Sequence, residues 1–273
     1  MKTFNILIIA SLAFFSFSEK KTIVTNSQMI ESKCSVKNTA FEAGEHVEFS
    51  VYYTVAGANF NAGAGSFKTS SEVLNGRPVF HIVGEGRTLP SYEWAYKVRD
   101  TYETYVDKAT MQPLKFVRNI NEGGYKKYQN VSFNKSANTA ISADGTFKTP
   151  ECVQDVVSSV FFARNINYNN LKVGDRIRFD LFLDNEIFNM YIRYLGKETI
   201  STKYGKIRAI KIKPLTIKGT IFEGGEKMTV WISDDENKVP LRVESPIIVG
   251  SVRLDMTSFS GLRNPMTSVI KKY

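Results

Sequence analysis

The feature that most constrains this chain is a pattern of strict two-residue alternation that occurs twice. The first copy runs from His46 to Val55, where apolar or aromatic side chains occupy every second position. The second follows the segment 171–175 and continues at Ile177, Phe179, Leu181 and Leu183. Because successive side chains of a strand point to opposite faces, a period of two predicts strands with one buried face. The chain is therefore predicted to consist mainly of antiparallel strands.

Other landmarks of the sequence also occur in pairs. In chain order they are Gly44 with Gly174, Gly76 with Gly205, Asp107 with Asp234, Gly124 with Gly250, and Phe133 with Phe259. The members of each pair lie about 130 residues apart, and the pairs keep the same order, which predicts an internal duplication. The two expected halves cover residues 41–148 and 168–262. Since the unpaired edge strands of one half can be covered by its twin, we expect a single β-rich unit over residues 41–273.

One helix is expected between the halves, near residues 150–165. Thr149 suits its N-cap, and Pro150 suits its first turn. An apolar stripe at helical spacing follows, formed by Val153, Val156, Val157, Val160 and Phe161. The expected fold is thus mainly β: a duplicated antiparallel meander forming an open barrel, a curved sheet or a sandwich, with this helix covering a concave face.

The start of the chain predicts export. Residues 1–18 combine an early lysine, an apolar run and a small-residue end, which is typical of a cleavable signal peptide. A membrane anchor is the alternative, but the run is shorter than the roughly 20 residues that span a bilayer. Lipid anchoring is not expected, because Cys34 lies too far behind the apolar run. We expect a periplasmic or extracellular protein, with residues 19–40 as a flexible polar leader.

The chain has two cysteines, Cys34 and Cys152. In an oxidising compartment an even number of cysteines favours a disulfide. Two free buried thiols are the alternative.

The formal net charge is +9, from 36 basic and 27 acidic residues. A basic surface attracts anions, and an exported protein seldom meets nucleic acid, so no nucleic-acid partner is expected. Peripheral contact with anionic envelope surfaces is the functional interpretation. Charge dispersed for solubility is the alternative, because no dense basic run occurs.

The sequence offers little for catalysis. Its two histidines, His46 and His81, lie in alternating strand segments, and no metal-ligand motif such as HExxH or CxxC is present. We therefore predict no catalytic residue, no cofactor and no metal site.

Four residues are candidates for binding a ligand: Trp94, Tyr96, Asp100 and Tyr102. The rings can stack on a sugar or line an apolar pocket, or they can belong to the sheet core. Asp100 falls on the more apolar face of its strand, where a carboxylate must find a partner or change its pKa. A satisfied structural carboxylate is the alternative.

Several segments together resemble the domain-of-unknown-function 3108 family of exported bacterial proteins. They are Val98-Arg99-Asp100-Thr101-Tyr102-Glu103 with Pro113-Leu114, Asp155-Val156-Val157-Ser158-Ser159 with its Phe-Phe-Ala-Arg end, the Gly205 hairpin, Val230-Trp231-Ile232-Ser233-Asp234-Asp235, and Val239-Pro240-Leu241-Arg242-Val243. The resemblance implies an exported β protein and supplies no activity.

Three hypotheses for function follow. The first is a non-catalytic envelope protein that binds a lipid, glycolipid or other amphiphilic ligand in a pocket between sheet and helix. The second is a glycan-binding or glycan-cleaving protein that uses Asp100, Glu103 and the neighbouring rings. The third is a structural or assembly module of the cell envelope whose partner pairs with an exposed sheet edge.

Overall fold

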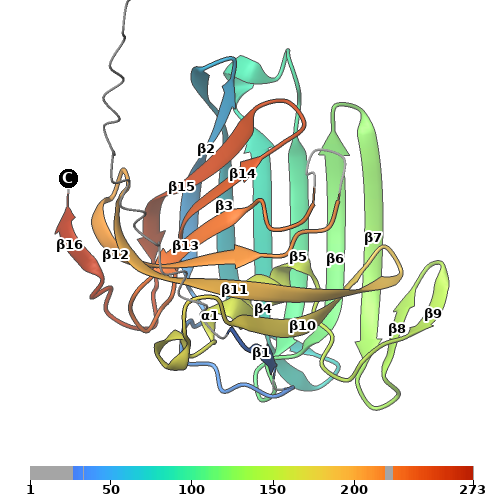
Figure 1. The fold of residues 1–273 in the computed structure, drawn as a ribbon. Coiled ribbons are helices and arrows are strands. Elements are labelled where there is room, and N and C mark those ends of the chain that lie inside the picture. Colours follow the sequence, from blue (N-terminus) through green and yellow to red (C-terminus); the bar gives the residue numbers. More distant parts are fainter. Residues whose placement is uncertain (1–26, 33, 219–223, 273) are drawn as a thin grey trace, which may run out of the picture.

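The computed structural model of the chain describes residues 27–32, 34–218 and 224–272. The expected signal peptide, residues 1–18, lies outside the described residues. The strands of the described part form one strongly curved, open sheet (Figure 1). This confirms the mainly β fold expected from the alternation.

The first run of strands forms a simple antiparallel meander in chain order. Its members are β2 (His46–Val55), β3 (Ala58–Leu74), β4 (Arg77–Thr88), β5 (Arg99–Asp107), β6 (Pro113–Glu122), β7 (Tyr125–Asn134), β8 (Thr139–Ser142) and β9 (Gly145–Lys148). A 3-10 turn, η1 (Pro90–Tyr92), lies in the connection between β4 and β5.

The second run follows the helix and a 3-10 turn, η2 (Tyr168–Asn170). It contains β10 (Arg176–Leu183), β11 (Glu186–Ser201), β12 (Gly205–Pro214), β13 (Thr229–Ser233), β14 (Pro240–Pro246) and β15 (Ser251–Ser260), while β16 (Val269–Lys272) pairs with β12. Strand β15 lies antiparallel to β2, with Asp255 opposite Ser50. The two runs are therefore joined edge to edge into one sheet.

The ends of the sheet meet through side chains. The turn between β10 and β11 reaches β6 and β7, where Asp184 accepts hydrogen bonds from Arg118 and Lys127. The Phe182 ring lies 5.9 Å from the Phe133 ring of β7. The two ends of the open sheet are thus joined on this side by an ion-pair cluster and apolar contacts, not by paired strands.

The helix, α1 (Val156–Arg164), begins later than the sequence suggests. Asp155 is its N-cap rather than Thr149, and its carboxylate accepts hydrogen bonds from the backbone N–H groups of Val157 and Ser158. Gln154 cannot join the helix, because its backbone pairs with β10 at Asp180 and Phe182. The expected helix near 150–165 is confirmed, but its cap and its first turn were placed too early.

The helix packs against the inner face of the sheet. Val157 and Phe161 are buried, and the Phe161 ring contacts the rings of Phe41 and Phe67 at 4.7 and 5.8 Å. Phe80 and Ile82 of β4 belong to the same cluster. Side chains of the described residues therefore fill the space between α1 and these strands.

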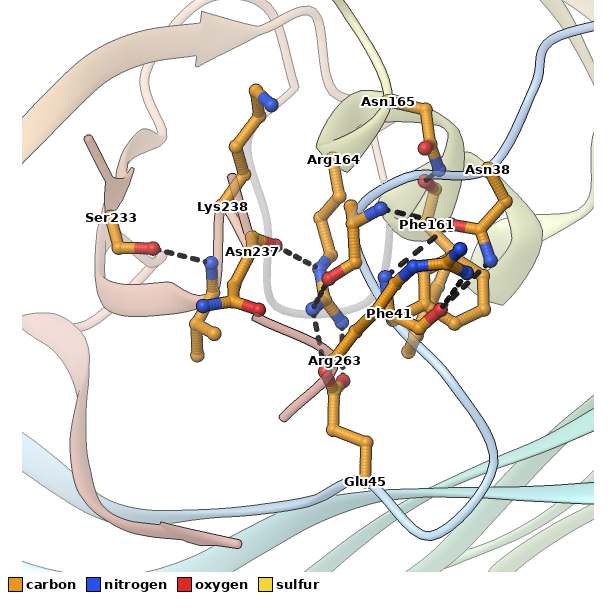
Figure 2. A network of polar contacts seen from close by, with 12 residues as sticks. Asn38, Phe41, Glu45, Phe161, Arg164, Asn165, Ser233, Asn237, Lys238 and Arg263 are labelled. Carbon is orange, nitrogen blue, oxygen red and sulfur yellow. Dashed lines mark hydrogen bonds and ion pairs between the residues drawn. The ribbon is translucent and has the colours of Figure 1, made fainter. Parts of the chain in front are cut away.

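A buried ion pair anchors the C-terminal end of the helix (Figure 2). The guanidinium of Arg164 donates to both carboxylate oxygens of Glu45 at 2.5 and 2.8 Å, and both side chains are almost completely buried. The same group donates to the backbone oxygens of Asn237 and Ala40, and it lies over the rings of Phe41 and Phe161. One arginine thus links α1, the start of β2, the loop before β14 and the segment before β2.

In its described part, from residue 27 onward, the segment before β2 is tied to the fold, although a flexible leader was expected over residues 19–40. β1 (Met29–Glu31) pairs in parallel with β10, and Ala40 is fully buried. The backbone of this segment is tied further by Asn38, whose side-chain oxygen accepts from the N–H groups of Ala40 and Phe41. Cys34 is paired with Cys152 in a disulfide, as the cysteine count predicted.

Candidate functional site

The four predicted ligand residues lie near one end of the sheet, where β4, β5, β6 and β7 turn. Trp94 is 86% exposed, and its indole N–H donates to the carbonyl of Ser91 in the same loop. The Tyr96 ring lies against Gly123 of the β6–β7 hairpin, where an added Cβ would come within 2.3 Å of it. Asp100 and Tyr102 follow on β5.

Asp100 finds its partner in Glu122 of β6. The two carboxyl groups share a hydrogen bond, and Asp100 also accepts from the backbone N–H of Asn121 at 2.9 Å. Burial raises the pKa of Glu122 to about 7, and the hydrogen bond and charge of Asp100 act in the same direction. The pair therefore holds a proton close to neutral pH.

Tyr102 stands beside this pair. Burial, followed by the charge of Asp100, raises the pKa of Tyr102 to about 12, while the positive charge of Arg118 opposes the shift. Burial alone would raise the pKa of Asp184, but the hydrogen bond from Lys127 and the charge of Arg118 hold it below its usual value. Glu122 and Arg118 were missed from the sequence because only the register of β5 with β6 brings them to Asp100 and Tyr102.

Glu103 lies on the other face of β5. His81 of β4 bridges it to Glu72, with Nε2 2.9 Å from Glu103 and Nδ1 2.7 Å from Glu72, and the imidazole stacks on Tyr105. Asp100 and Glu103 are three positions apart in one strand, so they face opposite sides of the sheet. This arrangement does not provide the pair of facing carboxylates that glycoside cleavage requires.

A hollow of about 580 Å³ lies on the outer face of β2–β6 and β15. We call it the outer hollow. It is lined by charged and small polar groups, including Glu48, Ser50, Ser66, Lys68, Glu85, Arg87, Arg99, Thr101 and Asn119. Asp100 belongs to the same lining, while its carboxyl group is engaged with Glu122 and Asn121.

Large apolar side chains are exposed at the end of the sheet that carries Trp94. They lie on the β2–β3, β6–β7 and β14–β15 hairpins and the β4–β5 loop, which share one end, at the top of Figure 1. We call this set the apolar rim: Phe60, Trp94, Tyr96, Tyr125, Ile248 and Val249. The sequence patterns did not single out Ile248 and Val249, which form the tip of the β14–β15 hairpin.

The chain matches a known protein family over most of its length. Residues 48–257 match the family described as protein of unknown function (DUF3108). The chain belongs to this family. No curated protein matches this DUF3108 chain.

Three solved structures are similar to the DUF3108 chain. A β-barrel-like protein of domain of unknown function DUF1849 from Brucella abortus has a TM-score of 0.52 at 9% identity, over 81% of this chain and 99% of its own. A putative lipoprotein from Parabacteroides distasonis has a TM-score of 0.37 at 14% identity, over 84% and 100%. A putative exported protein with a YmcC-like fold from Bacteroides fragilis has a TM-score of 0.31 at 13% identity, over 83% and 100%. The first likeness concerns the fold alone.

Two features are absent from the described residues of the DUF3108 chain. No group of three or more His, Cys, Asp or Glu side chains there is arranged to hold a metal ion. No helix there is long and apolar enough to cross a membrane.

Proposed function

We propose that this DUF3108 protein is an exported, non-catalytic envelope protein that docks onto an anionic lipid surface through its apolar rim. The signal-like residues 1–18 support export, and the Cys34–Cys152 disulfide fits an oxidising compartment. The single observation that carries the proposal is the gathering of exposed apolar side chains at one end of the sheet. Of the hypotheses from the sequence, it keeps lipid contact but moves it from the filled space beside α1 to the rim.

The composition of the rim favours a lipid interface. Trp and Tyr are enriched where a protein meets the headgroup layer, because their rings join an apolar body to a polar group. Ile248 is 67% exposed at a hairpin tip, and fully burying such a side chain is worth about 1.5–3 kcal/mol. Other exposed large hydrophobic residues lie elsewhere: Val73 is at the opposite end of β3, Tyr128 is farther along β7, Met29 is on β1 and Ile270 is on β16. Exposed apolar side chains gathered at one end of a protein favour an interaction site there.

The charges around the rim complement an anionic surface. Lys126, next to Tyr125, is exposed and has no ion-pair partner among the described residues. Glu93 is neutralised by Arg99 and Lys97. Glu122 is only partly ionised at neutral pH, because burial raises its pKa to about 7. A basic side chain close to an anionic membrane contributes about 1 kcal/mol of attraction.

Trp94 allows a direct test of docking. The chain has two tryptophans, and Trp231 is buried while Trp94 is exposed. Vesicles of phosphatidylglycerol and phosphatidylethanolamine should shift the emission of a Trp231→Phe variant to shorter wavelength, because Trp94 leaves water. Vesicles of phosphatidylcholine alone should produce a smaller shift, since they lack the anionic charge.

Variants of the apolar rim distinguish specific docking from non-specific hydrophobic adsorption. Ile248→Ser combined with Val249→Ser should lower co-sedimentation with the anionic vesicles about tenfold or more, since two apolar side chains are lost from the interface. Val73→Ser is the matched control, because Val73 is exposed at the opposite end of β3, and it should leave binding unchanged. Equal loss in both variants, or no blue shift of Trp94, would overturn the proposal.

A further inference from the structure

We propose that the outer hollow is a binding site for an anionic saccharide. The site is separate from the apolar rim and does not need a membrane, so it goes beyond the proposed docking function. It lies on the outer face of the strands whose inner face packs against α1.

The floor of the hollow is made of small side chains on neighbouring strands. Ser50 of β2 stands opposite Ala64 of β3, and Ala64 stands opposite Arg87 of β4. Thr101 of β5 pairs with Asn119 of β6, which extends the polar surface across the sheet. These hydroxyl and amide groups both donate and accept hydrogen bonds, as the hydroxyl groups of a sugar require.

The negative charges in the hollow are already engaged by the protein. Glu85 lies 3.5 Å from the ammonium of Lys68 and accepts from Ser66. Glu48 accepts a hydrogen bond from Ser258 at 2.5 Å. The carboxylates are therefore poor sites for an incoming cation.

Two side chains of the lining have nitrogen atoms without a hydrogen-bond partner among the described residues: Arg87 carries a full positive charge, and the other is the imidazole of His46, at Nε2. Arg99, the other arginine in the lining, is bound to Glu93 and to the carbonyls of Thr88 and Val98. Arg87 is exposed, and no hydrogen bond or ion pair of its guanidinium occurs among the described residues. A guanidinium presents a planar fork of N–H donors that fits a carboxylate, sulfate or phosphate group.

The lining also selects the rest of the ligand. A volume of about 580 Å³ falls in the range of small-molecule sites. Phe49 is the only large apolar residue of the lining, and its side chain packs on the opposite, inner face against Phe67. The hollow thus offers hydroxyl groups, an amide and one open guanidinium, which suits a hydroxyl-rich ligand with an anionic group.

The test uses three soluble probes and the mature protein without lipid. Tetragalacturonate carries sugar hydroxyls and carboxylates, maltotetraose is a neutral saccharide of equal length, and tetraglutamate is an acidic peptide. By isothermal titration calorimetry, tetragalacturonate should bind at least about tenfold more tightly than either other probe, and added NaCl should weaken its binding.

Variants locate the binding in the hollow. Arg87→Gln should weaken tetragalacturonate binding about tenfold, because the bidentate contact is lost. Ala64→Leu should abolish it by filling the floor. Lys148→Gln is the matched control, since it removes one exposed positive charge from β9 at the far end of the sheet, and it should bind like the wild type. Circular dichroism and thermal unfolding verify that each variant is folded.

Several outcomes would overturn the inference. Equal binding of maltotetraose would show that the anionic group is not recognised. Tighter binding of tetraglutamate would show that the hollow prefers an acidic peptide to a saccharide. Unchanged affinity in both the Arg87→Gln and the Ala64→Leu variants would place the probe elsewhere. The titrations contain no vesicle, so a negative result does not affect the proposal that the rim docks onto lipid. A negative result in the vesicle experiments likewise does not affect the proposal that the hollow binds a saccharide.

Discussion

Asp155 experiences two opposing effects on its ionisation. As the N-cap of α1 it accepts hydrogen bonds from two backbone N–H groups and from the hydroxyl of Thr104 at 2.5 Å, all of which favour the carboxylate. Its complete burial favours the neutral acid, and this effect is larger, so the pKa of Asp155 rises from 3.8 to about 6. A capping residue is thereby sensitive to mildly acidic pH.

The raised pKa of Asp155 predicts how stability changes with pH. Between about pH 4 and 6 the folded state binds this proton more tightly than the unfolded state, so the contribution of Asp155 to stability falls as the pH rises. Asp155→Asn keeps the capping oxygen and removes the titration. From pH 4 to pH 7 the wild type should lose about 2 kcal/mol relative to this variant, as measured by urea unfolding. A difference that stays constant over this range would contradict the prediction.

At the scale of single residues, the sequence predicts on which face of a strand a residue lies better than it predicts which residues it contacts. Alternation placed Asp100 on the more apolar face of β5, beside Tyr102, but its partner Glu122 depends on strand register. The two loops before Pro113 and Pro240, which the sequence pattern paired, show the same limit. Asp107 accepts from the N–H groups two and three residues ahead, and in the second loop Asp235 does so, although spacing from the proline had paired Asp107 with Asp234. The offset arises because Asp235 lies one residue closer to Pro240 than Asp107 lies to Pro113.

The helix shows why element boundaries are harder to predict than elements. The apolar stripe from Val153 to Phe161 predicted α1, and Thr149-Pro150 resembled a helix start. The chain instead turns at Glu151 and Cys152, where Cys152 is bonded to Cys34, and Gln154 then pairs with the backbone of β10. Both constraints come from residues distant in sequence. The polar composition before β2 similarly conceals Ala40 and Phe41, which are buried by α1 and β4.

The disulfide joins two segments that both lie along β10. Cys34 follows β1, Cys152 precedes the bridge at Gln154, and the two cysteines are 118 residues apart. On the chain-entropy model, replacing both with serine should cost up to about 4–5 kcal/mol in the free energy of unfolding. Hydrogen exchange should also accelerate at Met29–Glu31, because β1 is a short edge strand. Unchanged exchange there would show that β1 is held without the disulfide.

At the scale of the whole molecule, the Arg164–Glu45 pair connects parts of the chain that the sheet alone leaves apart. The helix, β2, the loop before β14 and the segment at Ala40 all meet at one guanidinium (Figure 2). Burying two charges is costly, and their contact repays the cost only while both are present. Removing one partner therefore damages the structure more than removing both.

This reasoning predicts the order of three variants in urea unfolding. Arg164→Met should cost about 3–5 kcal/mol, because Glu45 is left buried without a partner. The double variant Arg164→Met with Glu45→Met should recover much of that loss. Arg178→Met is the control, since its pair with Glu31 is solvent-exposed and worth at most about 1 kcal/mol. A double variant less stable than Arg164→Met would contradict this account.

The pairing of β2 with β15 also determines when the sheet can be completed during synthesis of the chain. Strand β2 is synthesised well before its neighbour β15, because Asp255 of β15 is opposite Ser50 in the sheet and follows it by 205 residues (255 − 50) in the sequence. Until β15 has been synthesised, β2 has one unpaired edge, which can pair with a strand of another molecule. Contacts between such distant segments also form slowly. A chain of this design gains by remaining unfolded until β15 is available, and passage across a membrane in an extended state would provide that delay for an exported protein.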